Sequence, residues 1–148
     1  MDVKRFCTFN LDGLWCGIAV ERVQEVIGSQ TMTPVPLAPS NVAGLVNLRG
    51  QIVTVLDLRP ALGVCVKPNA APPLLVVRGE PAVVALLLDE IGQVVEAPTA
   101  ALEASPGNLP AVARKLVPEV CKFSGRLLHV LDLDPLLGGL SRSRLGIS

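Results

Sequence analysis

Two pairs of side chains in this 148-residue sequence could do catalytic chemistry. His129 is the only histidine, and because an imidazole has a pKa near neutrality it could serve as a base. Cys121 precedes it across a turn at Ser124-Gly125 and could supply the nucleophile of a small hydrolase. Asp57 and Asp132 could act together as an acid and a base. Nothing else in the sequence supports either pair, so the elements that carry them decide between catalytic and structural roles.

An internal repeat favours structural roles at three of these positions. Residues 50–63 align without gaps with residues 125–138, and eight of the fourteen positions are identical. The repeat places Thr54 at the position of His129, so this position accepts any side chain that fits a strand face. It also places Asp57 at the position of Asp132, where turn capping or hydrogen bonding to the backbone is the better interpretation.

The remaining residue types predict no cofactor or metal site. The glycines form no GxGxxG or phosphate-binding loop, and no acidic cluster suits a divalent cation. The four cysteines include no CxxC pair and have no histidine at zinc-finger spacing, so we expect reduced, buried thiols. The sequence therefore predicts a protein that is not an enzyme and that binds no cofactor.

Charge and hydropathy limit the partners. Thirteen basic and thirteen acidic residues cancel, and no basic run is longer than the pairs Lys4-Arg5 and Arg114-Lys115. Such a chain offers little attraction to a phosphate backbone, so we expect no nucleic-acid partner. The longest apolar run, Ala82–Leu88, is shorter than the ~20 residues that cross a bilayer, and the amino terminus does not resemble a signal peptide. We expect a cytoplasmic protein without direct membrane insertion.

Short aliphatic segments between turns predict an all-β fold. Thirteen prolines and thirteen glycines interrupt the chain, and the segments between them are rich in Val, Leu and Ile. Helical turns are expected only at Ala111–Leu116 and after Asp134-Pro135, where an N-cap residue and a first-turn proline coincide. A second, weaker repeat sets Phe6–Val26 beside Leu74–Val94. The order of the strands therefore repeats along the chain.

The two repeats predict two similar small barrels in a single domain that spans residues 1–148. We place the first barrel at roughly residues 10–70, with one strand shared from the N- or C-terminal region, and the second at roughly residues 71–135. Closing each barrel removes exposed strand edges, and packing the barrels together buries apolar surface that neither covers alone. The groove between the barrels is the expected binding site.

The segment Asn47-Leu48-Arg49-Gly50 is the strongest candidate for a contact with a partner. Asn47 and Gly50 are turn formers on either side of Arg49, and Val42–Val46 supplies small and apolar surface ahead of them. One interpretation is a solvated charge in a loop. The other is an arginine whose planar donor group is oriented by a rigid turn, at the centre of an interface. The spacing alone leaves both interpretations open.

Several motifs, in one order along nearly the whole chain, resemble the CheW family, the coupling proteins of bacterial chemotaxis. The segment around Arg49 and the strand after it are similar to the family's signature. Three further segments resemble, in turn, the family's aromatic-x-Gly-Ile strand, its Val-Gln-Glu-Ile motif and a strand pair of its second half. The matching segments are Asn47-Leu48-Arg49-Gly50 with residues 52–59, Trp15-Cys16-Gly17-Ile18, Val23-Gln24-Glu25-Val26, and Val83 to Asp89 with Ile91 and Val94.

The resemblance implies a fold of two five-stranded SH3-like β-barrels around a shared hydrophobic core, with short peripheral helices. It also implies a function, which is to couple the cytoplasmic tip of a chemoreceptor to the regulatory domain of a CheA-type histidine kinase. The expected place is the cytoplasm, at membrane-bound or soluble receptor arrays. The receptor-binding residues that the resemblance implies are Arg49, Glu25, Val23, Leu45 and Ile91. It leaves the kinase-binding residues unassigned.

Three departures from the family pattern leave a second hypothesis open. Thr54 stands where the family often has proline, Ala85 stands where glycine is common, and the chain ends soon after Leu140. A changed carboxy-terminal end could alter one interface without disturbing either core. The alternative is a CheW-like accessory protein that binds a receptor but not the kinase, in a specialised motility pathway.

Overall fold

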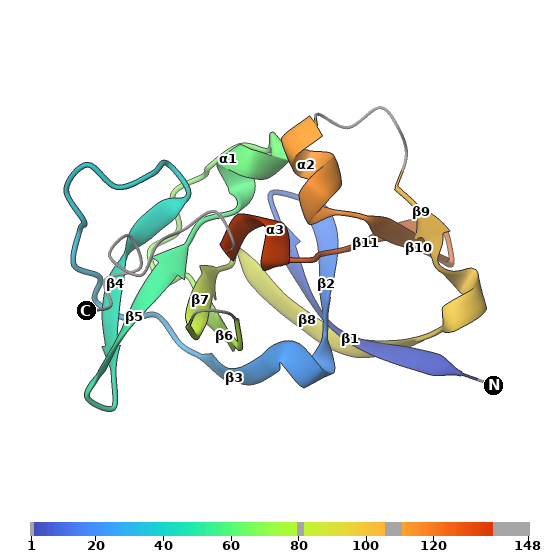
Figure 1. Cartoon of the computed structure of the whole chain (residues 1–148), viewed down its shortest axis with the longest axis horizontal. Helices are drawn as coiled ribbons and strands as arrows, with labels where there is room; N and C mark the ends of the chain where they lie inside the picture. The colour runs from blue at the N-terminus through green and yellow to red at the C-terminus, as the bar shows by residue number, and fades with distance from the viewer. Residues whose placement is uncertain (1, 80–81, 106–110, 138–148) are drawn as a thin grey trace.

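A computed structural model describes residues 2–79, 82–105 and 111–137, and Figure 1 shows the path of the chain. The strands are β1 (Val3–Leu11), β2 (Leu14–Ala19), β3 (Val23–Ile27), β4 (Val42–Leu48), β5 (Gln51–Leu56), β6 (Leu74–Val77), β7 (Val84–Leu87), β8 (Glu90–Pro98), β9 (Glu103–Ala104), β10 (Glu119–Phe123) and β11 (Arg126–Val130). The short helices are η1 (Val20–Arg22), α1 (Arg59–Leu62), η2 (Thr99–Ala101), α2 (Ala111–Leu116) and α3 (Asp134–Leu137).

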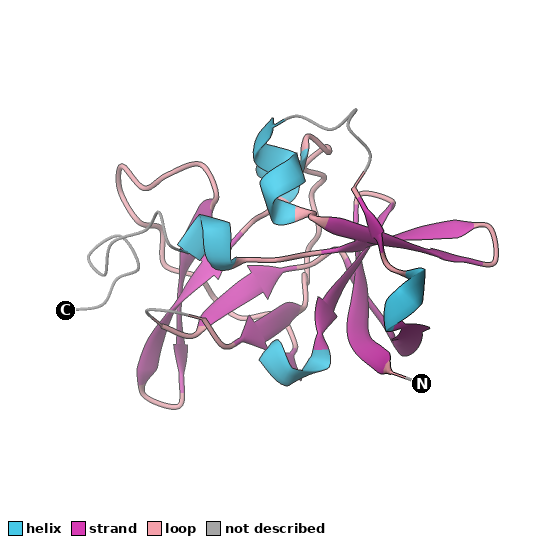
Figure 2. Cartoon of the chain, turned by 45° about the vertical axis from the view of Figure 1, so that its right-hand side comes forward, coloured by secondary structure: helices cyan, strands magenta, loops and turns pink. Residues whose placement is uncertain are grey.

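The strands form two sheets. Sheet A has the order β8-β1-β2-β11-β10-β9, and sheet B has the order β3-β6-β7-β5-β4. Figure 2 shows that strands are the main regular structure of the described chain and that the helices are short and lie outside the sheets. Both helical turns expected from the sequence are present, as α2 and α3. The prediction of an all-β fold with short peripheral helices is confirmed.

The sequence repeat is also a structural repeat. Two neighbouring pairs of strands are parallel: β5 with β7 in sheet B, and β11 with β2 in sheet A. Thr54 lies opposite Val84 in the first pair, and His129 lies opposite Cys16 in the second. Since the two repeats align Thr54 with His129 and Cys16 with Val84, the two pairs are equivalent. The same arrangement of strands is therefore built twice.

Each sheet takes strands from both halves of the sequence. The hairpin β1–β2 belongs to sheet A together with β8–β11, and the hairpin β6–β7 belongs to sheet B together with β3, β4 and β5. A division of the chain near residue 70 therefore does not separate the sheets, and more strands are exchanged between the halves than the single shared strand expected from the sequence. The exchange therefore joins the two halves of the sequence through backbone hydrogen bonds within each sheet.

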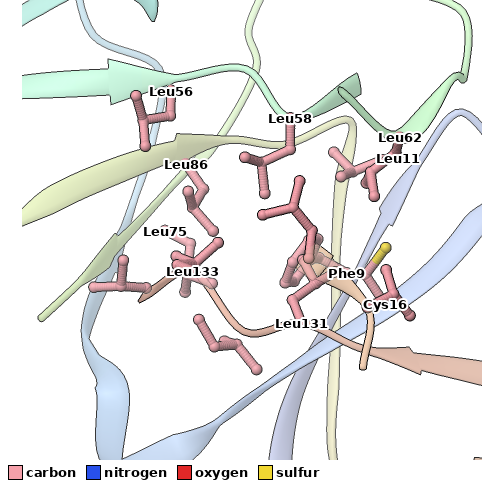
Figure 3. Packing of buried hydrophobic residues seen from close by; sticks show 14 of the residues in the cluster. Phe9, Leu11, Cys16, Leu56, Leu58, Leu62, Leu75, Leu86, Leu131 and Leu133 are labelled. Carbon is pink, nitrogen blue, oxygen red and sulfur yellow. The ribbon is translucent and has the colours of Figure 1, made fainter. Parts of the chain in front are cut away.

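Three clusters of buried side chains fill the described part of the molecule. One lies within sheet B and contains Val53, Val55 and Val76; another lies within sheet A and contains Phe6 and Leu128. The third and largest lies between the sheets. It takes alternate residues of their strands, because successive side chains of a strand point to opposite faces. Figure 3 shows ten of its members pointing toward one another: Phe9, Leu11, Cys16, Leu56, Leu58, Leu62, Leu75, Leu86, Leu131 and Leu133.

Two of the departures noted in the sequence fit the sheets without distortion. Thr54 is buried in β5, and Ala85 is fully buried in β7, where it joins the cluster within sheet B. The third departure, at the end of the chain after Leu140, lies outside the described residues. The fold therefore accommodates both Thr54 and Ala85 in buried strand positions.

Candidate functional site

Arg49 lies at the tip of the hairpin that joins β4 to β5. Arg49 and Gly50 have positive φ angles of 52° and 84°, the combination found in a type I′ turn, which matches the twist of the flanking strands. The side-chain oxygen of Asn47 accepts a hydrogen bond from the backbone N–H of Gly50, at 2.9 Å. The turn therefore holds the backbone of Arg49 in one conformation and presents its side chain, which is 71% exposed.

Glu25 lies on β3 and is the partner of Arg49. The Nη2 atom of Arg49 donates a hydrogen bond to the Oε2 atom of Glu25 and forms an ion pair with it. The hydrogen bond lowers the pKa of Glu25 and raises the pKa of Arg49. The other carboxylate oxygen of Glu25 is buried and has no hydrogen-bond partner among the described residues. The carboxylate thus lies partly inside the protein, with one oxygen directed to an exposed guanidinium.

A small cavity lies beneath this ion pair, at the end of the cluster within sheet B. It has a volume of about 130 Å³, and Val53, Val76 and Val83 are among its lining residues together with Arg49 and Glu25. Glu25 reaches it because a bulge between Val23 and Glu25 shifts the register of β3 against β6. The lining is therefore mixed, with the ion pair and the polar residues Gln24 and Gln51 beside apolar side chains.

The other three predicted receptor-binding residues do not line this cavity. Leu45 is half-buried on β4, opposite Thr54, on the face away from the cluster within sheet B. Val23 is half-buried and packs against the cluster between the sheets, and Ile91 on β8 is 37% exposed. The structure therefore brings Arg49 and Glu25 together and places Val23, Leu45 and Ile91 elsewhere on sheet B or sheet A.

Val23 and Ile91 are equivalent positions of the repeat. Val23 lies opposite Val77 of β6, and Ile91 lies opposite Phe9 of β1, at the same point of the two strand pairs. Three residues further along, Val26 and Val94 are also equivalent, and they are 46% and 57% exposed. The weaker repeat of the sequence aligns β3 with β8, so it already indicated that these two valines are equivalent.

The cysteine and histidine pair considered from the sequence is not formed. Cys121 lies opposite Leu128 in the β10–β11 hairpin, so the side chains of Cys121 and His129 point to opposite faces of sheet A. Cys121 is buried, and burial raises its pKa, which disfavours the thiolate that a nucleophile needs. The Nδ1 atom of His129 lies 3.0 Å from the backbone oxygen of Trp15. The hypothesis of a hydrolase built on these two residues is wrong.

Asp57 and Asp132 have the structural role that the repeat suggested. The Oδ1 atom of Asp57 accepts a hydrogen bond from the backbone N–H of Arg59, and the Oδ1 atom of Asp132 accepts one from the backbone N–H of Asp134. Each aspartate thus caps the turn that leads from a closing strand into a short helix. Within the described ranges, no group of three or more His, Cys, Asp or Glu residues could hold a metal ion. No helix in that part of the chain is long and apolar enough to span a membrane.

Comparison with known proteins places this arrangement in a family. The CheW-like domain matches residues 5–140. The chemotaxis protein CheW of Thermotoga maritima is 28% identical over 130 residues, which cover 88% of this chain and 85% of the relative. The CheW of Rhizobium meliloti is 26% identical over 118 residues, which cover 79% of this chain and 76% of the relative.

A solved structure has the same fold. The scaffolding protein TtCheW from Thermoanaerobacter tengcongensis superposes with a TM-score of 0.83 over 95% of each chain, at 21% sequence identity. The two sheets of this chain are thus the two SH3-like subdomains of that fold. Since the family match covers both sheets from residue 5 onward, the chain belongs to the CheW-like domain family.

Proposed function

We propose that this protein is a chemotaxis adaptor that couples chemoreceptors to a CheA-type histidine kinase, with Arg49 at the centre of its receptor contact. The observation that carries the proposal is the pairing of Arg49 with Glu25 at a small cavity that valines line in part, in a chain of the CheW-like domain family. An exposed ion pair contributes little to stability, so a role in binding accounts for it better.

The chemistry of this region suits a helical partner. A receptor tip that is a helical hairpin presents apolar side chains at one face and polar side chains beside them. The valines that line part of the cavity suit the first kind, and the exposed guanidinium of Arg49 suits a carboxylate or a backbone carbonyl. Glu25 would keep the guanidinium oriented before the partner arrives, which lowers the entropic cost of binding.

Val23, Leu45 and Ile91 would extend the contact beyond the cavity. Each is an apolar side chain that is partly or largely accessible, on β3, β4 and β8 respectively. Such side chains around a polar anchor would exclude water from the contact. We assign no kinase-binding residues, although the regulatory domain of the kinase is the expected second partner.

The proposed role requires neither catalysis nor a cofactor. Signalling would follow from holding a receptor and a kinase at a fixed geometry, in the cytoplasm and at receptor arrays. The accessory role, in which the protein binds a receptor alone, is not favoured, because the family match spans both subdomains and the two relatives described above are chemotaxis proteins named CheW.

Titration of the purified protein against its two expected partners tests the coupling function. A receptor signalling tip and a kinase regulatory domain would be labelled separately and titrated one at a time and then together. Saturable binding of each in the micromolar range or tighter, and a ternary complex in analytical ultracentrifugation, is expected. Binding of the receptor tip without the kinase domain would support the accessory role, and binding of neither would overturn the proposal.

A further inference from the structure

A buried network of ion pairs lies away from the Arg49 region. Arg59, whose side chain is only 6% exposed, donates two hydrogen bonds of 2.9 Å to the two carboxylate oxygens of Asp57. Its Nη1 atom donates a third, of 2.8 Å, to the Oδ1 atom of Asp89. A planar guanidinium with two carboxylates on separate sides is held in one orientation. The network therefore fixes the position of Asp89 relative to the end of β5.

Asp89 stands where the chain crosses from one sheet to the other. The preceding strand, β7, belongs to sheet B, and the following strand, β8, belongs to sheet A. The backbone N–H of Asp12, in the β1–β2 turn, donates to the Oδ2 atom of Asp89, and the backbone N–H of Asp89 donates to the backbone oxygen of Asn10. Asp89 is thus bonded to Arg59 on the side of sheet B and to the β1–β2 hairpin of sheet A.

A second layer of contacts surrounds this crossing. Lys67 forms an ion pair of 3.0 Å with the Oδ1 atom of Asp12, and the Oδ2 atom of Asp12 accepts a hydrogen bond from the backbone N–H of Cys65. The side-chain amide of Asn69 donates to the backbone oxygen of Asp89. The loop between α1 and β6 is therefore fastened to the same point.

Among the residues that the structure describes, no such buried network lies at the other crossing between the sheets, from β2 to β3. There Arg22 donates to the backbone oxygen of Arg78 and forms an ion pair with Asp134, whose side chain is 65% exposed. Ion pairs at the surface are weak because water and salt screen them, whereas loss of one member of a buried pair leaves an uncompensated charge. The two crossings are equivalent in the repeat but differ in how firmly they are held.

We propose that Arg59 is a positioning residue, which, through Asp89, fixes the β7–β8 crossing and so sets where β8 and its residue Ile91 lie relative to sheet B. The consequence for partner binding rests on the proposed function, because it takes Ile91 as part of the receptor contact. The positioning of β8 by Arg59 does not depend on the proposed function, since it concerns only the angle between β8 and sheet B. Ile91 follows Asp89 by two residues, so a shift of the crossing moves it directly.

The test is amide hydrogen exchange of the Asp89→Asn variant, followed by mass spectrometry. Asparagine keeps the size and one acceptor oxygen of Asp89 but loses the charge that faces Arg59. Exchange is expected to accelerate about tenfold in peptides that cover the crossing and the start of β8, with no change in peptides that cover β4 and β5. Arg5→Gln is the matched control. It breaks the exposed ion pair between Arg5 of β1 and Glu96 of β8, and it should leave exchange at the crossing unchanged.

A double-mutant cycle separates positioning from general destabilisation. If Asp89 acts through Arg59, then Arg59→Gln with Asp89→Asn accelerates exchange at the crossing no more than Arg59→Gln alone. Acceleration that is uniform over all peptides, or its absence at the crossing, would overturn the proposal. Asp89→Asn should also weaken receptor-tip binding about threefold, as expected for one misplaced contact of several. If hydrogen exchange at the crossing is not faster in Asp89→Asn, the positioning role of Arg59 is refuted. If a variant at Arg49 binds the receptor tip as well as the unmodified protein does, the receptor site is refuted.

Discussion

Sheet A and sheet B each contain a hairpin with the same type of turn, but the surfaces around the two turns differ. In the β4–β5 hairpin, Arg49 and Gly50 have positive φ angles, and in the β10–β11 hairpin the equivalent Ser124 and Gly125 have them too, at 40° and 85°. Sheet B presents an ion pair above a cavity at this end. The two turns therefore have the same backbone conformation and differ in their side chains.

Aromatic side chains occupy the corresponding end of sheet A. The rings of Trp15 and Phe123 meet edge to face with their centres 5.5 Å apart, and both pack against the cluster within sheet A. The guanidinium of Arg126 lies over the Trp15 ring, 4.1 Å from its centre, in a cation–π contact. At this end the guanidinium of Arg126 packs on an aromatic ring, whereas the guanidinium of Arg49 pairs with a carboxylate.

The difference shows which residues make the fold and which make the site. Residues shared by the two halves, such as Asp57 and Asp132, cap turns and close strands. Residues that differ between the halves decide what each end can bind: Arg49 against Ser124, and Glu25 against Gln93. A duplicated backbone can thus carry one binding surface and one structural end.

The largest expected effect is a loss of stability in the core of sheet A. Leu128→Ala removes a fully buried side chain of that cluster and should lower the free energy of unfolding by about 2–5 kcal/mol in urea denaturation. Val53→Ala, at the equivalent position in sheet B, removes fewer carbon atoms and should cost less. If Val53→Ala lowered the free energy of unfolding as much as Leu128→Ala, or more, the two cores would not be equivalent.

A smaller loss of stability, without a loss of binding, is expected at the aromatic end. Trp15→Ala removes the contacts with Phe123 and Arg126 and should lower the free energy of unfolding by about 2 kcal/mol, since the ring is only partly buried. Affinity for a receptor tip, measured by calorimetry on the folded variant, should not change. A strong loss of affinity would mean that this end also contacts the receptor.

The smallest effect is expected from neutralising Glu25. Glu25→Gln removes the ion pair but keeps the shape of the side chain, so receptor affinity should fall only about threefold and the melting temperature should stay nearly the same. Because the pKa of Glu25 lies below its usual value of 4.5, the ion pair is complete above that value and is lost only as the pH falls through the lower pKa of the folded protein.

The same pKa fixes the pH range in which this contact acts. Titrations of the unmodified protein at about pH 6 and pH 8 should give the same contribution from Glu25, since it is ionised at both. A difference between Glu25→Gln and the unmodified protein that disappears at pH 6 would contradict the ion pair described here.

The sequence predicted the doubled fold but not how its strands are shared. Identical residues in residues 50–63 and 125–138 indicated equivalent closing strands, and the structure pairs both in parallel with the second strand of a hairpin. Pattern alone could not show that each hairpin pairs with the closing strand of the other half, because strand pairing depends on contacts far apart in the chain. The exchange of hairpins was for this reason not expected.

The candidate site was predictable in part. The motif Asn-x-Arg-Gly identifies Arg49 as an arginine in a turn. Its contact with Glu25 joins residues 24 positions apart and follows a β-bulge, which the residue pattern does not predict. The Arg59 network was missed for a similar reason, since Asp12, Asp57 and Asp89 lie far apart in the sequence. Spacing identifies residues on one element, whereas a site joins several elements.

The most direct test compares one substitution at the two equivalent turns. Arg49→Glu and Ser124→Glu each place a carboxylate at an exposed position of positive φ, so their effects on folding should be similar and small in circular dichroism. In titrations with a receptor signalling tip, Arg49→Glu should weaken binding at least tenfold, roughly the cost of losing a central interface residue, and Ser124→Glu should not change it. Equal affinities of the two variants, with both folded, would contradict the assignment of receptor recognition to the Arg49 end.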